Sequence, residues 1–142
     1  MSGLHEFTAH ELREYLKAKK ASAVEVTNAV FSRIEKSEPK VDAYLSLLKE
    51  SAINTAKAVD AGKVSGPLAG IPIAIKDNMC IKGVKTTCAS KILENYIAPY
   101  NGTVIEKLQA AGAIFTGKTN MDEFAMGSST ENSGFKPTKN PW

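Results

Sequence analysis

Residues Gly70–Asn78 read Gly-Ile-Pro-Ile-Ala-Ile-Lys-Asp-Asn, an apolar run that ends in a lysine. Isoleucine recurs at every second position, and Pro72 and Ala74 make the opposite face nearly as apolar. A short run of this kind is typical of a strand that is buried on both sides. We therefore predict a buried strand over residues 70–76, with Lys76 at the point where it ends.

Lys76 is the candidate catalytic residue of this strand. A buried ammonium group is costly unless it is paired or gives up its proton. A lysine that is neutral near pH 7 can accept a proton and so serve as a general base. The alternative interpretation is a lysine whose stem packs on the strand while its charged head reaches water. The next residue, Asp77, fits two roles equally, capping a turn or orienting Lys76.

From Pro67 onward the chain alternates strand and helix patterns. Residues 103–106, Thr-Val-Ile-Glu, match a capping box and predict a helix with Val104 facing the core. Residues 113–116 predict a short strand after it. This order indicates a right-handed crossover, and so an α/β fold with a mixed, mainly parallel sheet flanked by helices. Ligands of such sheets bind beyond the carboxyl ends of strands, where Lys76 lies.

The first 62 residues are predicted to be mainly helical. Two capping boxes, Thr8–Glu11 and Ser22–Glu25, each begin a helix, because the paired side chains satisfy each other's free backbone N–H groups. Residues 49–61 predict a third helix. Residues 41–48 fit a strand or the start of a helix equally well.

Composition and charge exclude several classes of protein. The 142 residues carry a net charge of +3 from scattered basic residues, without the basic run and interleaved aromatics of a nucleic-acid-binding segment. No stretch approaches 18 continuous apolar residues, so we expect a cytoplasmic protein without a membrane span. Cys80 and Cys88 have no partner pair, which makes a zinc site or a disulfide unexpected.

Residues Gly112–Thr119 satisfy the P-loop expression but not its context. A phosphate-binding loop needs a strand before its first glycine and a helix that opens at its Lys-Thr pair. Here a predicted helix precedes Gly112, and the residues between the two glycines favour a strand. We therefore expect no binding of ATP or GTP by this segment.

A second candidate site is the small, polar stretch Ala125–Thr130. Gly127 permits close approach of the backbone to a ligand, and the hydroxyls of Ser128 and Ser129 are donors suited to a polar pocket. Met126 is expected to pack against the wall of that pocket. The alternative is an ordinary surface loop, which often has this composition.

Four motifs together resemble those of the amidase signature family: the Lys76 segment, residues 112–120, residues 121–133 and Asn140-Pro-Trp142. Within the family they are most similar to the glutaminase subunits, called the A subunits, of the glutamyl-tRNA(Gln) and aspartyl-tRNA(Asn) amidotransferases. The resemblance implies a Ser–cis-Ser–Lys triad in which Lys76 is the lysine. It also implies that Met126, Gly127, Ser128 and Ser129 border the acyl pocket.

The same resemblance implies where the chain stands in the whole protein. Residues 1–62 would be an N-terminal helical segment, and residues 63–142 the start of the catalytic domain. The family places both serines in a Gly/Ser-rich segment after Asn-Pro-Trp, so we expect this chain to be truncated before them. We expect it to be inactive by itself and, because of its uncovered sheet edge, to self-associate or to borrow a partner.

Activity and partners are likewise implied by the resemblance. The complete glutaminase would hydrolyse glutamine, and the ammonia would pass to the B subunit, which activates misacylated tRNA with ATP and magnesium, while the C subunit helps assembly. This chain would hold no cofactor and would meet tRNA only through the complex. A stand-alone amidase acting on another amide would match Lys76 equally well. A short chain without the serines would instead be a binding or assembly module.

Overall fold

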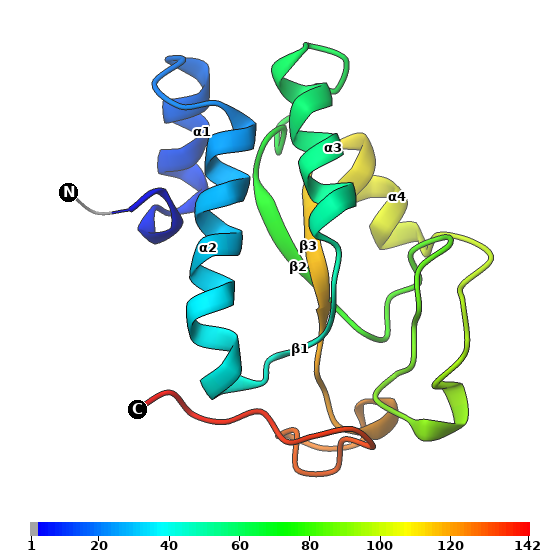
Figure 1. Cartoon of the computed structure of the whole chain (residues 1–142). Coiled ribbons are helices and arrows are strands. Elements are labelled where there is room, and N and C mark those ends of the chain that lie inside the picture. The colour runs from blue at the N-terminus through cyan, green and yellow to red at the C-terminus, as the bar shows by residue number, and fades with distance from the viewer. Residues whose placement is uncertain (1–2) are drawn as a thin grey trace. The chain divides into compact units, whose positions relative to one another are not determined.

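The computed structural model describes residues 3–142 (Figure 1). Within this range the helices are α1 Ala9–Lys17, α2 Ala23–Val41, α3 Lys49–Asp60 and α4 Thr103–Ala110. The strands are β1 Tyr44–Leu47, β2 Pro72–Lys76 and β3 Ile114–Thr119, and short 3₁₀ turns are η1 Leu4–Glu6, η2 Lys91–Leu93 and η3 Glu123–Ala125. Among the described residues, none of the helices has the length and apolar composition needed to cross a bilayer.

The strands form one mixed sheet in the order β1-β3-β2. β1 runs antiparallel to β3. β2 and β3 run parallel, because the Ile114 N–H donates to the Ile71 carbonyl at one end and the Asp77 N–H donates to the Thr119 carbonyl at the other. α4 lies between these two strands in the sequence. The predicted α/β fold with a mixed sheet is therefore confirmed.

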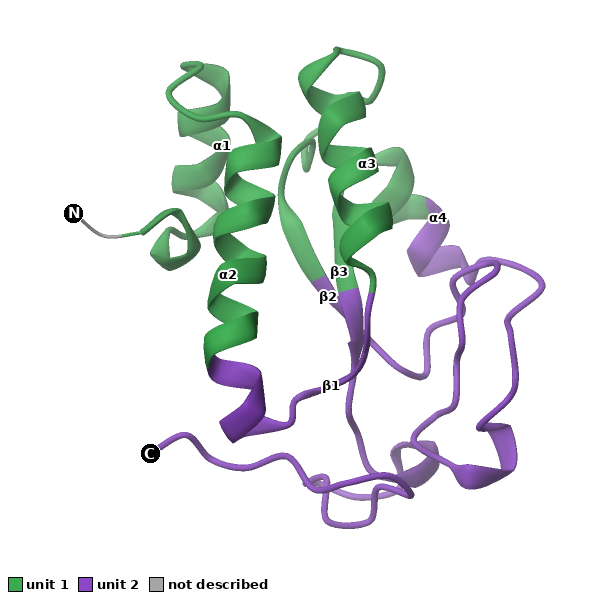
Figure 2. Cartoon of the chain, in the orientation of Figure 1, with its two compact units in different colours: residues 1–36, 48–73, 107–116 green, residues 37–47, 74–106, 117–142 purple. Residues whose placement is uncertain are grey.

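The chain forms two compact units, each assembled from separated segments (Figure 2). The first consists of residues 1–36, 48–73 and 107–116, and the second of residues 37–47, 74–106 and 117–142. β2 and β3 each run from the first unit into the second. Every candidate site residue predicted from the sequence belongs to the second unit.

The first unit is built on two helices whose starts are fixed as predicted. The Thr8 N–H donates to Glu11 Oε2 at 2.7 Å, and the Glu11 N–H donates back to Thr8 Oγ1 at 3.2 Å. The second capping box, at Ser22–Glu25, forms in the same way. Leu12 and Val26 of these helices pack with Ile71 in a buried apolar cluster.

Three local expectations are changed by the structure. Residues 44–47, left open between strand and helix, are a strand. The capping box at residues 103–106 does not form, because α4 already includes Thr103 and the Glu106 N–H donates to the Gly102 carbonyl instead. In this helix Val104 is 53% exposed and Ile105 is fully buried. The prediction that Val104 faces the core was wrong.

β2 is also less buried than predicted. Within Pro72–Lys76, Ala74 is exposed, Pro72 and Ile73 are half-buried and only Ile75 is buried, although Ile71 just before the strand is buried as well. The reason is that β2 stands at the edge of the sheet among the described residues, so part of its surface is uncovered. An edge position also tolerates Pro72, which lacks a backbone N–H to donate.

The difference in burial between Ile105 and Val104 predicts a sharp contrast in stability. Ile105→Ala should lower the free energy of unfolding by about 2–5 kcal/mol, because it leaves a cavity in a packed interior. Val104→Ala, one residue away on the exposed face, should change it by no more than about 0.5 kcal/mol. Urea denaturation of the two variants checks this. Equal losses would contradict the register of the helix.

Candidate active site

Lys76 is the last residue of β2, and its side chain is exposed. Its neighbours Ile75 and Asp77 are both buried, which is the alternation of an extended strand. The Lys76 carbonyl accepts the Met79 N–H at 3.1 Å, so a turn begins directly after the strand. The predicted place of Lys76 at a strand end is confirmed. The apolar surroundings expected for it are not present within residues 3–142.

A buried ion pair lies directly behind this strand end. Lys118 of β3 is completely buried, and its Nζ lies 2.8 Å from Asp77 Oδ1. The same Nζ donates to Thr86 Oγ1 at 3.1 Å. The sequence reasoning missed this pair, because it treated Lys118 only as part of a P-loop look-alike. A lysine inside a run that reads as a buried strand was the signal that a carboxylate must lie opposite.

Asp77 is bonded through all of its polar groups. Its second carboxylate oxygen accepts the Thr87 N–H at 2.9 Å and the Thr87 hydroxyl at 2.5 Å. Its backbone N–H donates to the Thr119 carbonyl, and its own carbonyl accepts the Cys88 N–H, both at 3.1 Å. Lys118 completes the set. Hydrogen bonds and the ion pair therefore fix both the backbone and the side chain of Asp77, the residue that follows Lys76.

The stretch Ala125–Thr130 is organised around a buried carboxylate. Asp122 accepts the backbone N–H groups of Ser129 at 2.7 Å and of Asn132 at 2.9 Å. A Cβ atom on Gly127 would lie 2.5 Å from Asp122 Oδ2, so only glycine fits there. Gly127 thus permits a close approach, as predicted, but the group that approaches is this carboxylate.

The four predicted substrate-binding residues differ in their surroundings. Ser128 and Ser129 border an open hollow of about 580 Å³, which Thr138 and Lys139 also line. Met126 is 81% exposed among the described residues, and its place at a pocket wall stays a prediction. Neither Met126 nor Lys76 lines this hollow.

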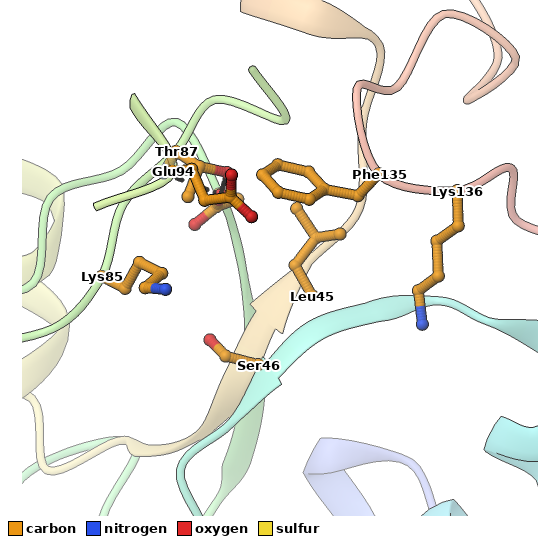
Figure 3. A pocket seen from close by; sticks show the side chains of 8 residues that line it. Leu45, Ser46, Lys85, Thr87, Glu94, Phe135 and Lys136 are labelled. Carbon is orange, nitrogen blue, oxygen red and sulfur yellow. Dashed lines mark hydrogen bonds between the residues drawn. The ribbon is translucent and has the colours of Figure 1, made fainter. Parts of the chain in front are cut away.

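A smaller cavity of about 270 Å³ lies elsewhere in the second unit (Figure 3). Its lining includes Phe135, Lys85 and Lys136 on its sides, together with Asp77 and Thr87. Asp77 and Thr87 already bond to each other, and no buried side-chain polar atom among the described residues lacks a partner. The cavity is below the usual size of a ligand site.

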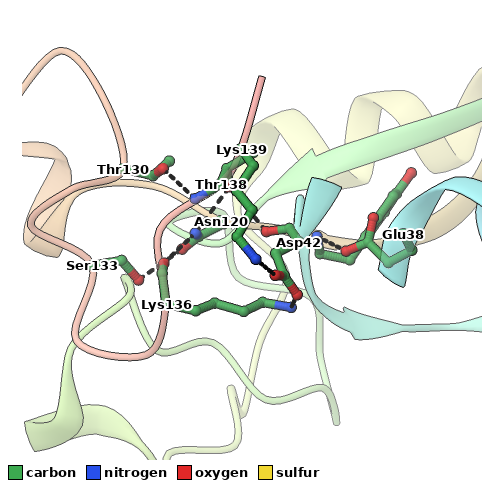
Figure 4. A network of polar contacts seen from close by, with 9 residues as sticks. Glu38, Asp42, Asn120, Thr130, Ser133, Lys136, Thr138 and Lys139 are labelled. Atoms are coloured by element: carbon green, nitrogen blue, oxygen red, sulfur yellow. Dashed lines mark hydrogen bonds and ion pairs between the residues drawn. The ribbon is translucent and has the colours of Figure 1, made fainter. Parts of the chain in front are cut away.

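A polar network holds the course of residues 130–139 (Figure 4). Asp42 pairs with Lys136 at 3.1 Å and with Lys139 at 3.2 Å. Hydrogen bonds from these two lysines lower the pKa of Asp42, so their stabilising effect is complete above the ordinary pKa of 3.8 and is lost as the pH falls below it. Asn120 donates to the Lys136 carbonyl at 2.7 Å. The network fixes the segment that leads to residues 140–142.

Of the two cysteines, Cys88 is disfavoured as an alternative nucleophile. Both are free and half-buried. Burial, and then the negative charge of Asp77, raise the pKa of the Cys88 thiol, which disfavours the reactive thiolate at neutral pH. Within residues 3–142, no three His, Cys, Asp or Glu side chains gather where they could hold a metal ion.

Comparison with known proteins identifies the family. The amidase family pattern matches residues 25–142, most of the chain and all of the site described above. This chain belongs to the amidase signature family. The A subunit of glutamyl-tRNA(Gln) amidotransferase from Carboxydothermus hydrogenoformans is 59% identical over 143 residues, which cover 98% of this chain and 30% of that protein. The chain spans about 30% of the length of the curated relatives it matches.

Solved amidase structures share the fold. The A subunit of glutamyl-tRNA(Gln) amidotransferase from Thermotoga maritima matches with a TM-score of 0.75 and 36% identity, over 98% of this chain and 28% of that one. Fatty acid amide hydrolase matches with a TM-score of 0.89 and 27% identity, over 97% of this chain and 25% of that one. The fold is thus common to different amidases, and the sequence identity is what separates them.

The P-loop look-alike of this amidase chain is part of its sheet. α4 precedes Gly112, and residues 114–119 are β3, as the sequence context predicted. Lys118 is buried against Asp77, and a Cβ atom on Gly117 would lie 2.4 Å from the Ser46 carbonyl oxygen of the neighbouring strand. The segment has neither a free lysine nor an open loop for a phosphate.

We therefore predict that isothermal titration calorimetry detects no binding of ATP or GTP to this segment. The control is a titration of Lys107→Met, which changes an exposed lysine of α4 and keeps the ion pair. Micromolar ATP binding that Lys118→Met abolishes and Lys107→Met retains would contradict the prediction.

Proposed function

We propose that this chain is the N-terminal part of the glutaminase subunit of an aminoacyl-tRNA amidotransferase, with Lys76 as its general base. The observation that carries the proposal is the 59% identity over nearly the whole chain to a protein named as the A subunit of such an enzyme. The position of Lys76 supports it, since the residue is exposed at the carboxyl end of a strand, where ligands of such sheets bind.

In this proposal the complete glutaminase hydrolyses glutamine through a Ser–cis-Ser–Lys triad. Unprotonated Lys76 takes a proton from the cis-serine, which takes one from the nucleophilic serine as that serine attacks the side-chain amide carbon. Backbone N–H groups stabilise the oxyanion. The proton returns through the same relay to the departing nitrogen, ammonia leaves, and water then releases glutamate from the acyl-enzyme.

The remaining residues and partners take roles that fit this reaction. Met126, Gly127, Ser128 and Ser129 border the acyl pocket, and the exposed face of β2 leaves Lys76 accessible to the serine segment. Ammonia passes to the B subunit, where ATP and magnesium serve to activate the misacylated tRNA, and the C subunit helps assembly. The complex works in the cytoplasm, and this chain meets tRNA only through it.

A second candidate is a stand-alone amidase, and the TM-score of 0.89 to fatty acid amide hydrolase favours it. The identity there is 27%, far below the 59% to the amidotransferase relative. Because fold similarity is shared by the whole family, the sequence identity decides for the glutaminase of an amidotransferase. Hydrolysis of fatty or aryl amides in preference to glutamine would reverse that choice.

The proposal predicts that Lys76→Arg is nearly as inactive as Lys76→Ala. Arginine keeps the positive charge but does not give up its proton in a protein, so it cannot act as the base. The measurement is amide formation on misacylated tRNA by the full-length glutaminase in its complex, with glutamine as nitrogen donor. Lys82→Arg, an exposed lysine of the following loop, is the matched control.

Ammonium as donor separates a lost base from a lost fold. Both Lys76 variants should keep the ammonium-dependent reaction, because the chemistry on tRNA does not use this lysine. If Lys76→Arg retains most of the glutamine-dependent rate, Lys76 is not the base. Loss of both reactions in an assembled complex would equally rule out a specific role in the amidase step.

A polypeptide of residues 1–142 produced alone should not hydrolyse glutamine. The reason is that positioning by Lys76 and the polar loop cannot replace the covalent step of the two triad serines, which the family resemblance places after residue 142. Glutamate release from a purified sample is the measurement. Release above background that Lys76→Ala abolishes would show that this polypeptide carries its own nucleophile.

A further inference from the structure

We propose that the buried ion pair of Lys118 and Asp77 holds Lys76 in its catalytic position, so that both are positioning residues for the amidase reaction. The inference rests on the proposed function, because it takes Lys76 to be the base. Asp77 is joined to Lys76 by a peptide bond, and Lys118 Nζ lies 2.8 Å from Asp77 Oδ1. Neither side chain needs to touch the substrate.

The first argument is the register of the strand. Neighbouring side chains on a strand point to opposite sides, so an inward Asp77 requires an outward Lys76. A slip of β2 by one residue would exchange the two. The slip would also leave the Lys118 ammonium group buried without a carboxylate, which is strongly unfavourable. The ion pair therefore selects the one register in which Lys76 is presented outward.

The second argument is energetic. Removing two charges from water costs several kcal/mol per ion, and well-packed apolar residues of similar volume often stabilise a protein as much or more. Stability alone therefore does not account for a completely buried lysine in β3. Unlike an apolar contact, the ion pair is directional, because it fixes which atom of Asp77 faces which donor.

The third argument is that the pair joins the strand end to the predicted substrate loop. The Asp77 carbonyl accepts the Cys88 N–H, and the Cys88 carbonyl accepts the Phe124 N–H at 2.9 Å. Cys88 and Phe124 both have a φ of 51°, a left-handed conformation that non-glycine residues rarely adopt. Such backbone persists only where surrounding bonds hold it. One chain of bonds thus runs from Lys118 to the turn that precedes Met126.

The decisive variant is the double substitution Asp77→Asn with Lys118→Met in the full-length complex. It removes both charges together, so no unpaired charge stays buried, and the new amide keeps an oxygen that can accept from Thr87. The glutaminase kcat and KM are measured, and each rate is divided by the ammonium-dependent rate of the same sample. That ratio removes any loss of assembled complex from the comparison.

We expect kcat to fall about 10- to 100-fold, as a displacement of a catalytic group by about 1 Å would cause, while KM changes less than about twofold. The control is Lys49→Met, which removes the exposed pair of Lys49 with Glu35 and should leave kcat unchanged. A double variant whose kcat stays within twofold of the unsubstituted enzyme would overturn the inference.

A milder pair of variants tests the same idea without touching a charge. Thr87→Val removes the hydroxyl that donates to Asp77 Oδ2, whereas Thr87→Ser keeps it. Thr87→Val should lower the normalised kcat about 3- to 10-fold, in the range of one lost hydrogen bond, and Thr87→Ser should restore it. Equal and undiminished kcat values for both would count against the positioning role.

The two proposals fail in different ways. Full glutaminase activity of Lys76→Ala would contradict the proposed role of Lys76 as the base, and this inference would fail with it. If Lys76→Ala is inactive but the double variant Asp77→Asn with Lys118→Met is fully active, only this inference is contradicted and the proposed function stands. A purely structural role of the pair would lower the glutamine- and ammonium-dependent rates together, leave their ratio unchanged and so overturn the positioning role.

Discussion

The second unit of this protein is organised around one buried ammonium group, that of Lys118, which requires a carboxylate beside it. Lys118 lies on a fully buried stretch of β3, where an ammonium group without a partner would be strongly destabilising. Asp77 meets that need, and the loop that supplies Thr86 and Thr87 is fixed by the same contacts. The end of β2, the following loop and the presentation of Lys76 all depend on it.

A second carboxylate organises the candidate substrate loop by a different kind of contact. Asp122 pairs with backbone N–H groups rather than with a lysine, and Gly127 lies against it because a side chain would not fit. The loop that carries Ser128 and Ser129 is thus shaped by hydrogen bonds, although the residues themselves are exposed. Ser128 and Ser129 are thus exposed and yet fixed in position, as is usual for ligand-binding residues on loops.

Much of the fold could be predicted from the sequence because its signals are local. The capping boxes at residues 8 and 22 depend on side chains three residues apart, and both form as predicted. The prediction at residue 103 was wrong because the same pattern fits a helix that starts one residue earlier, and only packing chooses between the two. The burial of β2 was overestimated because an edge strand and a central strand share the same apolar pattern.

The candidate site was less predictable because it depends on contacts between distant segments. Lys76 could be singled out, since a lysine at the end of an apolar run is conspicuous in any sequence. Its connection to Lys118 could not, because the two lie on strands whose pairing no local pattern reveals.

The look-alike motif is the clearest example of that limit. Residues 112–119 match a phosphate-binding pattern because the same glycine, lysine and threonine spacing also suits a buried strand. In a P-loop the glycines open the backbone toward a phosphate and the lysine reaches it. Here Gly117 allows β1 to approach β3, and Lys118 turns inward to a carboxylate of the same chain. The residue types are those of an anion-binding site, and the anion they bind is Asp77.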